Sequence, residues 1–390
     1  KCAMNKCTET IPAAKDVRTL FDIPADVVYL NAASKSAIPI AALEAGRSGV
    51  GAKAQPWAID EPGRYTQAHH VRALFADLIG ATAHDIAIQP AASYGIATAA
   101  RQLSPTAGSQ IILLEGQFPS NVYAWRRLAA EIGAEIITVP SPDDDDWTAA
   151  VLGVLSEKTA IAALPPVHWV DGTVLDLEKI GAALKDVDAA FVVDATQWIG
   201  VQPLDVAAIQ ADFVVCAAYK WLLGPYGMSL MYAAPAHQNG VPLEEHLFNK
   251  GGVASITGGL GYTDDFSEGA MRYDAGEYLN LITLPMIEAS LQQISAWGPA
   301  QIGARIAPIT AHIADGAQAL GLNVAPARAR CPHIITLRRD GGFPAETVPK
   351  LDALGIYVSA RGGHIRVSPY IFNDINDANR FLNGLESVLS

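Results

Sequence analysis

Two stretches decide the fold class of this chain: AFVVDATQ at residues 190–197 and DFVVCAAYK at residues 212–220. Each contains a short apolar run of the kind that forms a strand buried on both faces of a parallel sheet. The first run ends at Asp194, and the second leads to Lys220. Because ligands bind outside the carboxyl ends of the strands in an open α/β sheet, we expect the acid and the amine to converge on one crevice.

The same pattern extends on either side of these stretches. Turn-bounded apolar runs occur at residues 27–30, 86–89, 111–114, 135–139, 160–164 and 229–233. Helix-length segments, such as 120–133 and 177–184, separate them. Strands that alternate with helices predict an α/β fold with a mainly parallel, doubly wound sheet covered by helices.

Beyond Ala234 the composition changes, which predicts a second and smaller domain of α+β type. Residues 251–276 are rich in Gly, Ser, Thr and Asp, and long helical patterns follow at 284–297 and 302–320. Strand-like segments and an amphipathic helix at 377–389 complete this unit. We therefore expect an N-terminal arm at 1–25, a large domain at 26–270 and a small domain at 271–390.

Composition narrows the function classes. The 390 residues carry 27 Lys and Arg against 40 Asp and Glu, a formal net charge of −13. An acidic chain without a basic cluster is not expected to bind nucleic acid. Half of the residues are hydrophobic, yet no apolar run approaches the roughly 20 residues that span a bilayer. The polar start KCAMNKCTET lacks the apolar stretch of a secretory signal, so a cytoplasmic location is expected.

No metal site is expected. Cys2 and Cys7 are two thiols in a polar arm without a second pair of ligands. The four aspartates at 143–146 are most simply a solvated loop. A nicotinamide or ATP site is not expected either, because GxxxxGK[ST] is absent and the glycines at 258–261 do not open a clear helix after a strand.

The pair formed by Asp194 and Lys220 has two interpretations. A carboxylate and a lysine at such a crevice fit pyridoxal phosphate chemistry, in which the lysine forms a Schiff base and the acid partners the ring nitrogen. The same two residues fit an ordinary ion pair at the sheet edge equally well.

Further motifs give the chain a resemblance to a known family. They are YLNAASKSAIP at 29–39, QPAASYGIATAARQL at 89–103, EGQFPSN at 115–121, DATQWIGVQPLDV at 194–206, CAAYKWLLGPYG at 216–227 and HIRVSPYIFNDINDANRFL at 364–382. With these motifs in this order, the chain resembles the class V aminotransferase group of fold-type I pyridoxal phosphate enzymes, which includes cysteine desulfurases and kynureninases. The resemblance implies a homodimer that acts on a small amino acid, with the active site at the subunit interface.

The resemblance also assigns cofactor contacts. It makes Lys220 the Schiff-base lysine and the base that moves the Cα proton, and it makes Asp194 the partner of the pyridine nitrogen. Gln197 matches the position that hydrogen-bonds the ring hydroxyl, and Phe118 matches the aromatic residue that stacks on the ring, although Phe118 also fits a plain core role.

At the phosphate end, the resemblance points to a turn and a tyrosine. Ala92 and Ser93 align with the phosphate-binding turn, where a helix offers its N-terminal amides to the anion. Ser93 by itself also fits a simple helix cap. Tyr219 matches the kynureninase pattern rather than the His-Lys pair of desulfurases, and its hydroxyl would lie near the phosphate.

On the substrate side, Arg366 falls where the family places an arginine for the substrate carboxylate. Asn31 lies in the N-terminal turn near the same group, and Trp169 with His168 borders the ring in relatives. His168 also fits a core histidine. Lys35 is a second cation that would recognise an acidic side chain on the substrate, or else a lysine that extends to solvent.

Two departures from the family limit the choice of reaction. Gly276 is followed by Glu277 where relatives often carry Gly-Thr for the partner's phosphate, which leaves Tyr278 or Asn280 for that contact. The segment SARGGHIRVSP lacks a cysteine, and Cys216 and Cys331 fall on expected strands, so cysteine desulfurase activity is disfavoured. We expect a transaminase or a kynureninase-like C–C or C–X lyase, with a non-catalytic binding or regulatory protein as the alternative.

Overall fold

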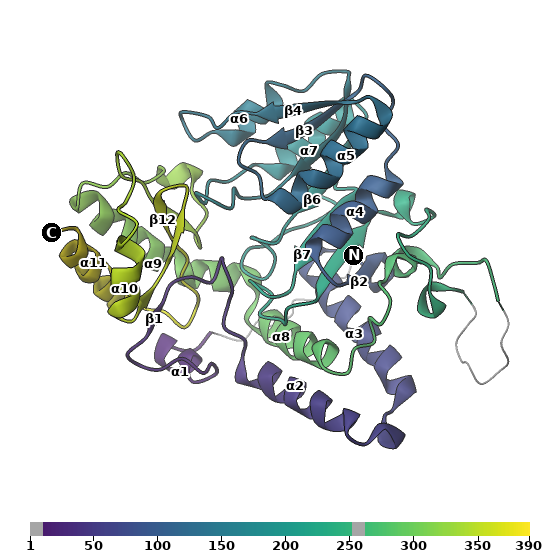
Figure 1. The fold of residues 1–390 in the computed structure, drawn as a ribbon, viewed down its shortest axis with the longest axis horizontal. Helices are drawn as coiled ribbons and strands as arrows, with labels where there is room; N and C mark the ends of the chain where they lie inside the picture. Colours follow the sequence, from purple (N-terminus) through teal and green to yellow (C-terminus); the bar gives the residue numbers. More distant parts are fainter. Residues whose placement is uncertain (1–10, 252–261) are drawn as a thin grey trace.

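A seven-stranded sheet forms the centre of the computed structural model, which describes residues 11–251 and 262–390 (Figure 1). Its strands, in order across the sheet, are β2 (Ile86–Gln89), β8 (Ser229–Ala233), β7 (Phe213–Ala217), β6 (Ala190–Asp194), β5 (Thr159–Leu164), β3 (Gln110–Leu114) and β4 (Glu135–Val139). Only β8 runs antiparallel to its neighbours. The predicted α/β fold with a mainly parallel sheet is therefore confirmed.

Helices cover both faces of this sheet, which explains why its strands read as continuous apolar runs. In β3, Ile111 and Leu113 pack on one face with residues of α4 (Ala92–Gln102) and α5 (Tyr123–Ile132). Ile112 and Leu114 pack on the other face. The helices of that second face are α3 (Glu61–Ile79), α6 (Trp147–Leu152), α7 (Leu177–Asp186) and α8 (Thr283–Trp297).

A second core surrounds a three-stranded antiparallel sheet. The order of its strands is β11 (Ser359–Arg361), β12 (His364–Val367) and β9 (Ile335–Leu337). The helices around it are α9 (Pro299–Ala319), α10 (Thr347–Ala353) and α11 (Ile375–Leu389). These elements form the left part of Figure 1.

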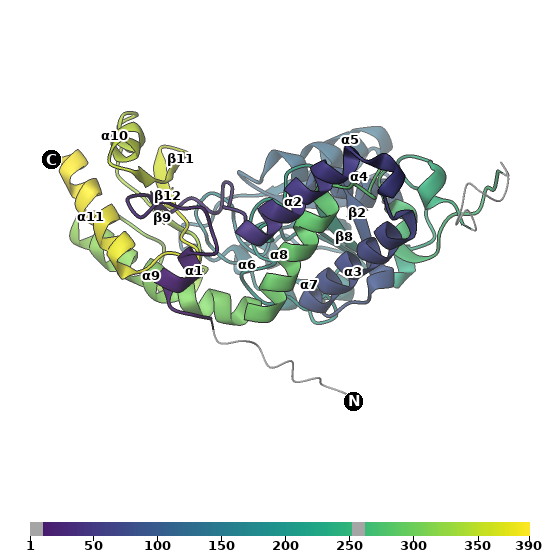
Figure 2. The same ribbon diagram turned by 90° about the horizontal axis from the view of Figure 1, so that it is seen from below.

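The two cores share elements across the boundary expected from sequence. β1 (Val28–Tyr29) pairs in parallel with β10 (Ile356–Tyr357), so Val28 packs in the second core although it was expected in the large domain. Conversely, α8 packs in the first core although it follows residue 271. Gly298, at a φ of 80°, joins α8 to α9, which spans both cores (Figure 2). Periodicity identifies a helix, but only packing shows which core it serves.

The helices α1 (Ala14–Arg18) and α2 (Ile40–Lys53) flank β1 in the chain. The turn between β1 and α2 lies against the second domain, because Asn31 bridges to Ser368 and the Ala32 N–H donates to the Ser368 carbonyl at 3.0 Å. Residues 31–36 are thereby brought toward the carboxyl end of the central sheet, where the Ser36 N–H donates to the Tyr219 carbonyl at 3.3 Å.

The acidic run is accounted for by local structure. Asp146 caps α6 by accepting from the Ala149 N–H, and Asp145 forms a 2.9 Å ion pair with Arg338. Across the described residues, no cluster of His, Cys, Asp and Glu is arranged to hold a metal ion, and Cys2 and Cys7 lie outside them. Within the same ranges, no helix combines the length and apolarity needed to cross a membrane.

Candidate active site

A cavity of about 270 Å³ lies at the carboxyl ends of β6 and β7. Asp194 ends β6, and Lys220 follows the end of β7 by three residues. The structure brings eight of the predicted site residues to the wall of this cavity: Ala92, Ser93, Phe118, Trp169, Asp194, Gln197, Tyr219 and Lys220. The convergence expected at the sheet edge is thus present in the fold.

Lys220 is held in a tight turn and is only 6% exposed. The Gly224 N–H donates to the Ala218 carbonyl, and Leu223 adopts a φ of 55°, so the chain reverses directly after the lysine. The pKa of Lys220 is lowered to about 8, mainly by burial. The charge of Asp194 opposes this lowering, and the charges of Arg366 and Arg361 contribute to it. A lysine with this pKa carries a neutral, nucleophilic amine in about a tenth of molecules at pH 7.

Asp194 is buried beside this amine, at 8% exposure. Its Oδ1 accepts from the Thr196 N–H at 3.1 Å. Burial raises the pKa of Asp194, while the contacts from Thr196 and the charge of Lys220 lower it. The site therefore holds a buried carboxylate for which a cationic group in the cavity is a favourable partner, as the protonated nitrogen of a pyridine ring would be.

Gln197 is positioned by both ends of its amide. Its Oε1 accepts from the Trp221 indole N–H at 2.8 Å, and its Nε2 donates to the Ala33 carbonyl at 2.9 Å. The amide nitrogen has a second hydrogen, and Gln197 lines the cavity. That hydrogen suits an acceptor oxygen on a bound ring.

Aromatic side chains form the walls on either side of the lysine. The Lys220 Nζ lies 5.3 Å from the centroid of Phe118 and 5.6 Å from that of Tyr219. Phe118 packs edge-on against Trp169 at 5.4 Å, and Tyr219 stacks on Tyr226 at 4.3 Å. A flat aromatic ligand between these walls would find ring faces to stack on.

The opposite end of the cavity is the N-terminus of α4. Ala91 is the N-cap residue and offers no side-chain cap, while the Tyr94 and Gly95 N–H groups already donate to its carbonyl. Ala92 and Ser93 open the helix and line the cavity. Helix N-terminal amides and a serine hydroxyl are groups that bind phosphate. The cavity thus offers a lysine, a carboxylate, aromatic faces and an anion-binding end, which together fit pyridoxal phosphate.

The substrate side is assembled from other parts of the chain. Arg366, on β12, is 1% exposed and donates to the Trp169 carbonyl at 2.6 Å and to the Ser34 hydroxyl at 2.7 Å. Asn31 lies in the same turn as Ser34, and its Oδ1 is buried with no hydrogen-bond partner among the described residues. Arg366, Asn31 and Lys35 do not line the cavity themselves. Arg366 is buried against Trp169, which does line it, whereas Lys35 is exposed to solvent, so the structure does not bring Lys35 to the site.

Four residues near the site were missed by sequence reasoning. Thr196 orients Asp194 and accepts from the Ala217 N–H, Gln117 lines the cavity, and Ser34 and Arg361 lie beside Arg366. A signal existed for Arg361. The sequence Arg361-Gly-Gly-His has a two-residue hairpin turn, which places Arg361 and Arg366 on one face of two paired strands.

His168 has a structural role next to the site. Its ring stacks on Trp147, its Nδ1 lies 3.4 Å from a carboxylate oxygen of Asp171, and its Nε2 lies 3.3 Å from the Glu115 carbonyl. It does not line the cavity. The alternative interpretation of His168 as a core histidine agrees with this position.

Tyr278 and Asn280, the two residues considered for a contact to a partner's phosphate, and the nearby Gly276 have local roles in this chain. The Gly276 N–H donates to Glu244, Asn280 accepts from the Ile282 and Thr283 N–H groups, and Tyr278 lies under the Arg72 guanidinium at 5.1 Å. Cys216 and Cys331 are both buried, and burial raises the pKa of each thiol. Neither lines the cavity.

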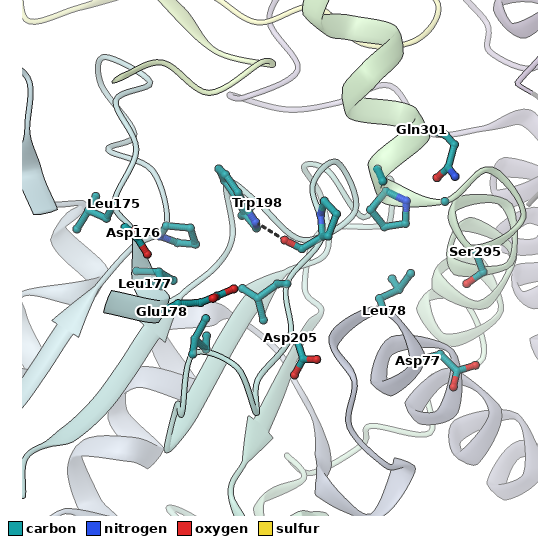
Figure 3. A pocket seen from close by; sticks show the side chains of 17 residues that line it. Asp77, Leu78, Leu175, Asp176, Leu177, Glu178, Trp198, Asp205, Ser295 and Gln301 are labelled. Atoms are coloured by element: carbon teal, nitrogen blue, oxygen red, sulfur yellow. Dashed lines mark hydrogen bonds between the residues drawn. The ribbon is translucent and has the colours of Figure 1, made fainter. Parts of the chain in front are cut away.

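A larger cavity, of about 590 Å³, lies elsewhere (Figure 3). It lies where the end of α3, the start of α7 and the junction of α8 with α9 meet, and it contains none of the predicted site residues. Asp176, Glu178 and Asp205 are among the residues that line it, and the Trp198 indole N–H donates to the Pro203 carbonyl at 2.8 Å. Volume alone therefore does not identify the reactive site.

Comparisons with known proteins agree with this geometry. The family model described as Aminotransferase class-V matches residues 28–378. An uncharacterized aminotransferase of Bacillus subtilis, YcbU, is 24% identical over 301 residues, which cover 77% of this chain and 78% of that protein. A cysteine desulfurase of Klebsiella pneumoniae is 26% identical over 299 residues, which cover 72% of this chain and 71% of that protein.

Solved structures share the fold. The apo structure of a cysteine desulfurase from Thermococcus onnurineus has a TM-score of 0.82 at 20% identity, and the match covers 97% of this chain and 98% of that one. The cystine C–S lyase C-DES, in complex with its product cysteine persulfide, has a TM-score of 0.84 at 21% identity, with 93% and 97% covered. At this identity the likeness concerns the fold.

Proposed function

This chain belongs to the aminotransferase class-V family and is a pyridoxal-phosphate-dependent enzyme, and we propose that it transforms an α-amino acid at Lys220. One observation carries the proposal above all others. Lys220 and Asp194 lie in one cavity at adjacent strand ends, and the pKa of the lysine is lowered to about 8. A structural ion pair has no need of a cavity with aromatic walls and an anion-binding end.

The residues divide the work of holding the cofactor. Lys220 would hold it covalently, Asp194 would lie at the ring nitrogen, Gln197 at the ring hydroxyl and Phe118 on the ring face. Ser93, Ala92 and the start of α4 would hold the phosphate, with Tyr219 nearby. When bound, pyridoxal phosphate supplies an electron sink for negative charge at the substrate Cα.

The protein's own groups then handle the substrate. Arg366 would hold the α-carboxylate, with Asn31 and Trp169 beside it, so that one bond at Cα is oriented for cleavage. Lys220 would take the Cα proton onto Nζ, since its lowered pKa suits a general base near neutral pH. Burial of Lys220 and Asp194 keeps water from both groups.

The subtype that we propose is a transaminase or a kynureninase-like lyase. A desulfurase needs an accessible thiolate to attack the substrate sulfur. In the described part of the chain the two cysteines, Cys216 and Cys331, are buried, and Gly362 and Gly363 form the turn between β11 and β12. Because curated relatives include cysteine desulfurases, a sulfide assay is part of the test.

The first experiment is an absorption spectrum of the purified protein beside that of Lys220→Ala, followed by borohydride reduction and peptide mapping. We expect a yellow wild-type protein, an altered spectrum in the variant and a reduced adduct on Lys220. Amino acids are then screened for keto acid, pyruvate, ammonia and sulfide. A wild-type protein that stays colourless with added pyridoxal phosphate would contradict the proposed function.

We also propose a homodimer with the active site at its interface. Tyr226 stacks on Tyr219 at the cavity yet is 63% exposed, and Trp57 is 81% exposed. Large exposed aromatic side chains of this kind are typical of contact surfaces. Light scattering after size-exclusion chromatography measures the mass in solution, which is expected to be that of two chains. A cytoplasmic location stays a prediction from sequence.

A further inference from the structure

Two arginines lie side by side at the substrate side without an acidic partner. Arg366 and Arg361 both donate to the Ser34 hydroxyl, at 2.7 Å and 3.1 Å. Their guanidinium carbons lie 5.9 Å and 5.8 Å from the centroid of Trp169, which lines the cavity. Neither forms an ion pair with a carboxylate within residues 11–251 and 262–390. Two cations therefore face one another across a neutral hydroxyl.

The hairpin register places both arginines here. Ser359 pairs with Arg366, and Arg361 pairs with His364, so Arg361 and Arg366 occupy diagonal positions on one face of β11 and β12. Gly362 and Gly363 supply the positive φ angles, 55° and 82°, of the two-residue turn. The pairing is thus built into the backbone and does not depend on a flexible loop.

Each guanidinium has its own anchor. The Arg366 Nη1 donates to the Trp169 carbonyl at 2.6 Å, and the Arg361 Nη1 donates to the Ala360 carbonyl at 2.7 Å. The Nη2 of each arginine meets Ser34, and both Nε atoms are buried without a partner among the described residues. Buried donors without partners are costly in free energy. The two unpaired Nε groups belong to different side chains. A ligand with two separate acceptor groups could therefore satisfy both of them better than a ligand with one.

The charges of Arg366 and Arg361 also favour a ligand with two negative groups. Burial and, to a smaller extent, the charge of Arg361 together lower the pKa of Arg366 to about 9, and burial lowers the pKa of Arg361. Both arginine charges also lower the pKa of Lys220. One α-carboxylate compensates one of these charges. A neutral side chain on the substrate would leave the half-buried guanidinium of Arg361 without an anionic partner.

We propose that the substrate is an acidic amino acid and that Arg361 binds its side-chain carboxylate while Arg366 binds its α-carboxylate. The inference rests on the proposed function, because it concerns the substrate of the same site. It transfers to Arg361 the specificity role that the sequence had suggested for Lys35, which is exposed to solvent. Trp169 lies under both guanidinium groups and also lines the cavity, so it connects the arginine pair to the cofactor site.

The test uses two ligands that lack an amine and so do not react: succinate and its monoamide, succinamate. Their dissociation constants for the protein loaded with pyridoxal phosphate are measured by isothermal titration calorimetry. We expect the wild type to bind succinate at least about tenfold more tightly, as a charge-assisted hydrogen bond to arginine implies. Arg361→Gln is expected to bind both ligands within about twofold of each other, with the value for succinamate unchanged.

Control variants separate charge from folding. Lys35→Gln is expected to keep the wild-type ratio, because Lys35 is exposed. Arg361→Lys retains the positive charge and is expected to keep a preference for succinate, at a lower ratio because the planar fork is lost. Melting temperature and cofactor absorption establish that each variant is folded and loaded.

The outcomes are distinguishable. Equal binding of the two ligands by the wild type, or equal weakening of both by Arg361→Gln, would overturn the assignment of Arg361. If Lys35→Gln loses the preference for succinate over succinamate, the side-chain carboxylate is recognised by Lys35, and the assignment of Arg361 is overturned as well. If the wild type takes up no pyridoxal phosphate and gives no borohydride adduct, it is the proposed function that fails.

Discussion

The cofactor cavity and the neighbouring substrate group, which contacts it through Trp169, are built in opposite ways. On the cofactor side, Asp194 and Lys220 come from neighbouring strands of one sheet and carry opposite charges. On the substrate side, Ser34, Trp169 and the arginines come from three distant segments, and the two arginine charges are alike. On the first side the lysine and the carboxylate balance each other's charge, whereas on the second side the two arginines have no carboxylate partner within the described residues.

This difference teaches how the site divides its tasks. A parallel sheet fixes the ends of adjacent strands relative to one another, which suits groups whose geometry must not change. The substrate groups are placed by packing between two cores, through β12, the turn after β1 and the segment around Trp169. Substitutions on the first side are expected to affect chemistry, and those on the second side to affect selection.

The largest effect is expected for Lys220→Ala. Loss of the group that moves the proton removes about 10²- to 10⁴-fold from kcat, because a positioned acid or base contributes that much. Steady-state kinetics on whichever amino acid the screen identifies measure it. Lys35→Ala is the matched control and is expected to leave kcat unchanged, because Lys35 is exposed. Near-normal turnover by Lys220→Ala would show that Lys220 does not take part in the reaction.

A smaller loss is expected for Asp194→Asn. The substitution keeps the shape and the contact from the Thr196 N–H but removes the charge that pairs with a ring nitrogen. A charge-assisted hydrogen bond contributes about 1.5–3 kcal/mol, so affinity for pyridoxal phosphate is expected to fall about 10- to 100-fold. Equilibrium dialysis measures this constant. Unchanged affinity and unchanged turnover together would show that Asp194 only fills the sheet edge.

The pH dependence of cofactor uptake is expected to follow Lys220. Its pKa is about 8 in the folded chain, and only the neutral amine attacks, so the rate constant should rise about tenfold per pH unit below 8 and level off above it. Stopped-flow absorbance on the cofactor-free protein measures the profile. In Asp194→Asn the midpoint should move to lower pH, because the charge of Asp194 raises the pKa of Lys220. A midpoint near 10 would contradict the burial of the amine.

The smallest effect is expected for Ser34→Ala, on the substrate side. The hydroxyl accepts from both arginines, so its loss should loosen them without removing a charge. We expect KM to rise about three- to tenfold with kcat nearly unchanged, because both guanidinium charges stay in place and only the hydroxyl that positions them is lost. A fall in kcat at constant KM would instead show that Ser34 acts in the reaction itself and not in substrate binding.

The sequence alone predicted much of the fold. Runs such as 111–114 are apolar at every position because the helices on both faces bury them, and the order of strands and helices then indicates a mainly parallel sheet. It did not predict that β1 pairs with β10, or that α8 packs in the first core. Those contacts join residues far apart in the chain, and local periodicity carries no information about them.

For the site, the sequence determined which chemistry was available, because Asp194 and Lys220 follow buried strands and strand ends in a parallel sheet meet at one edge. Tertiary structure alone decided the second cation: it leaves Lys35 in solvent and turns Arg361 toward Ser34 beside Arg366. The reason is physical. Side chains within one sheet are related by its regular geometry, whereas those on a turn and on a hairpin of another core meet only when both cores are packed.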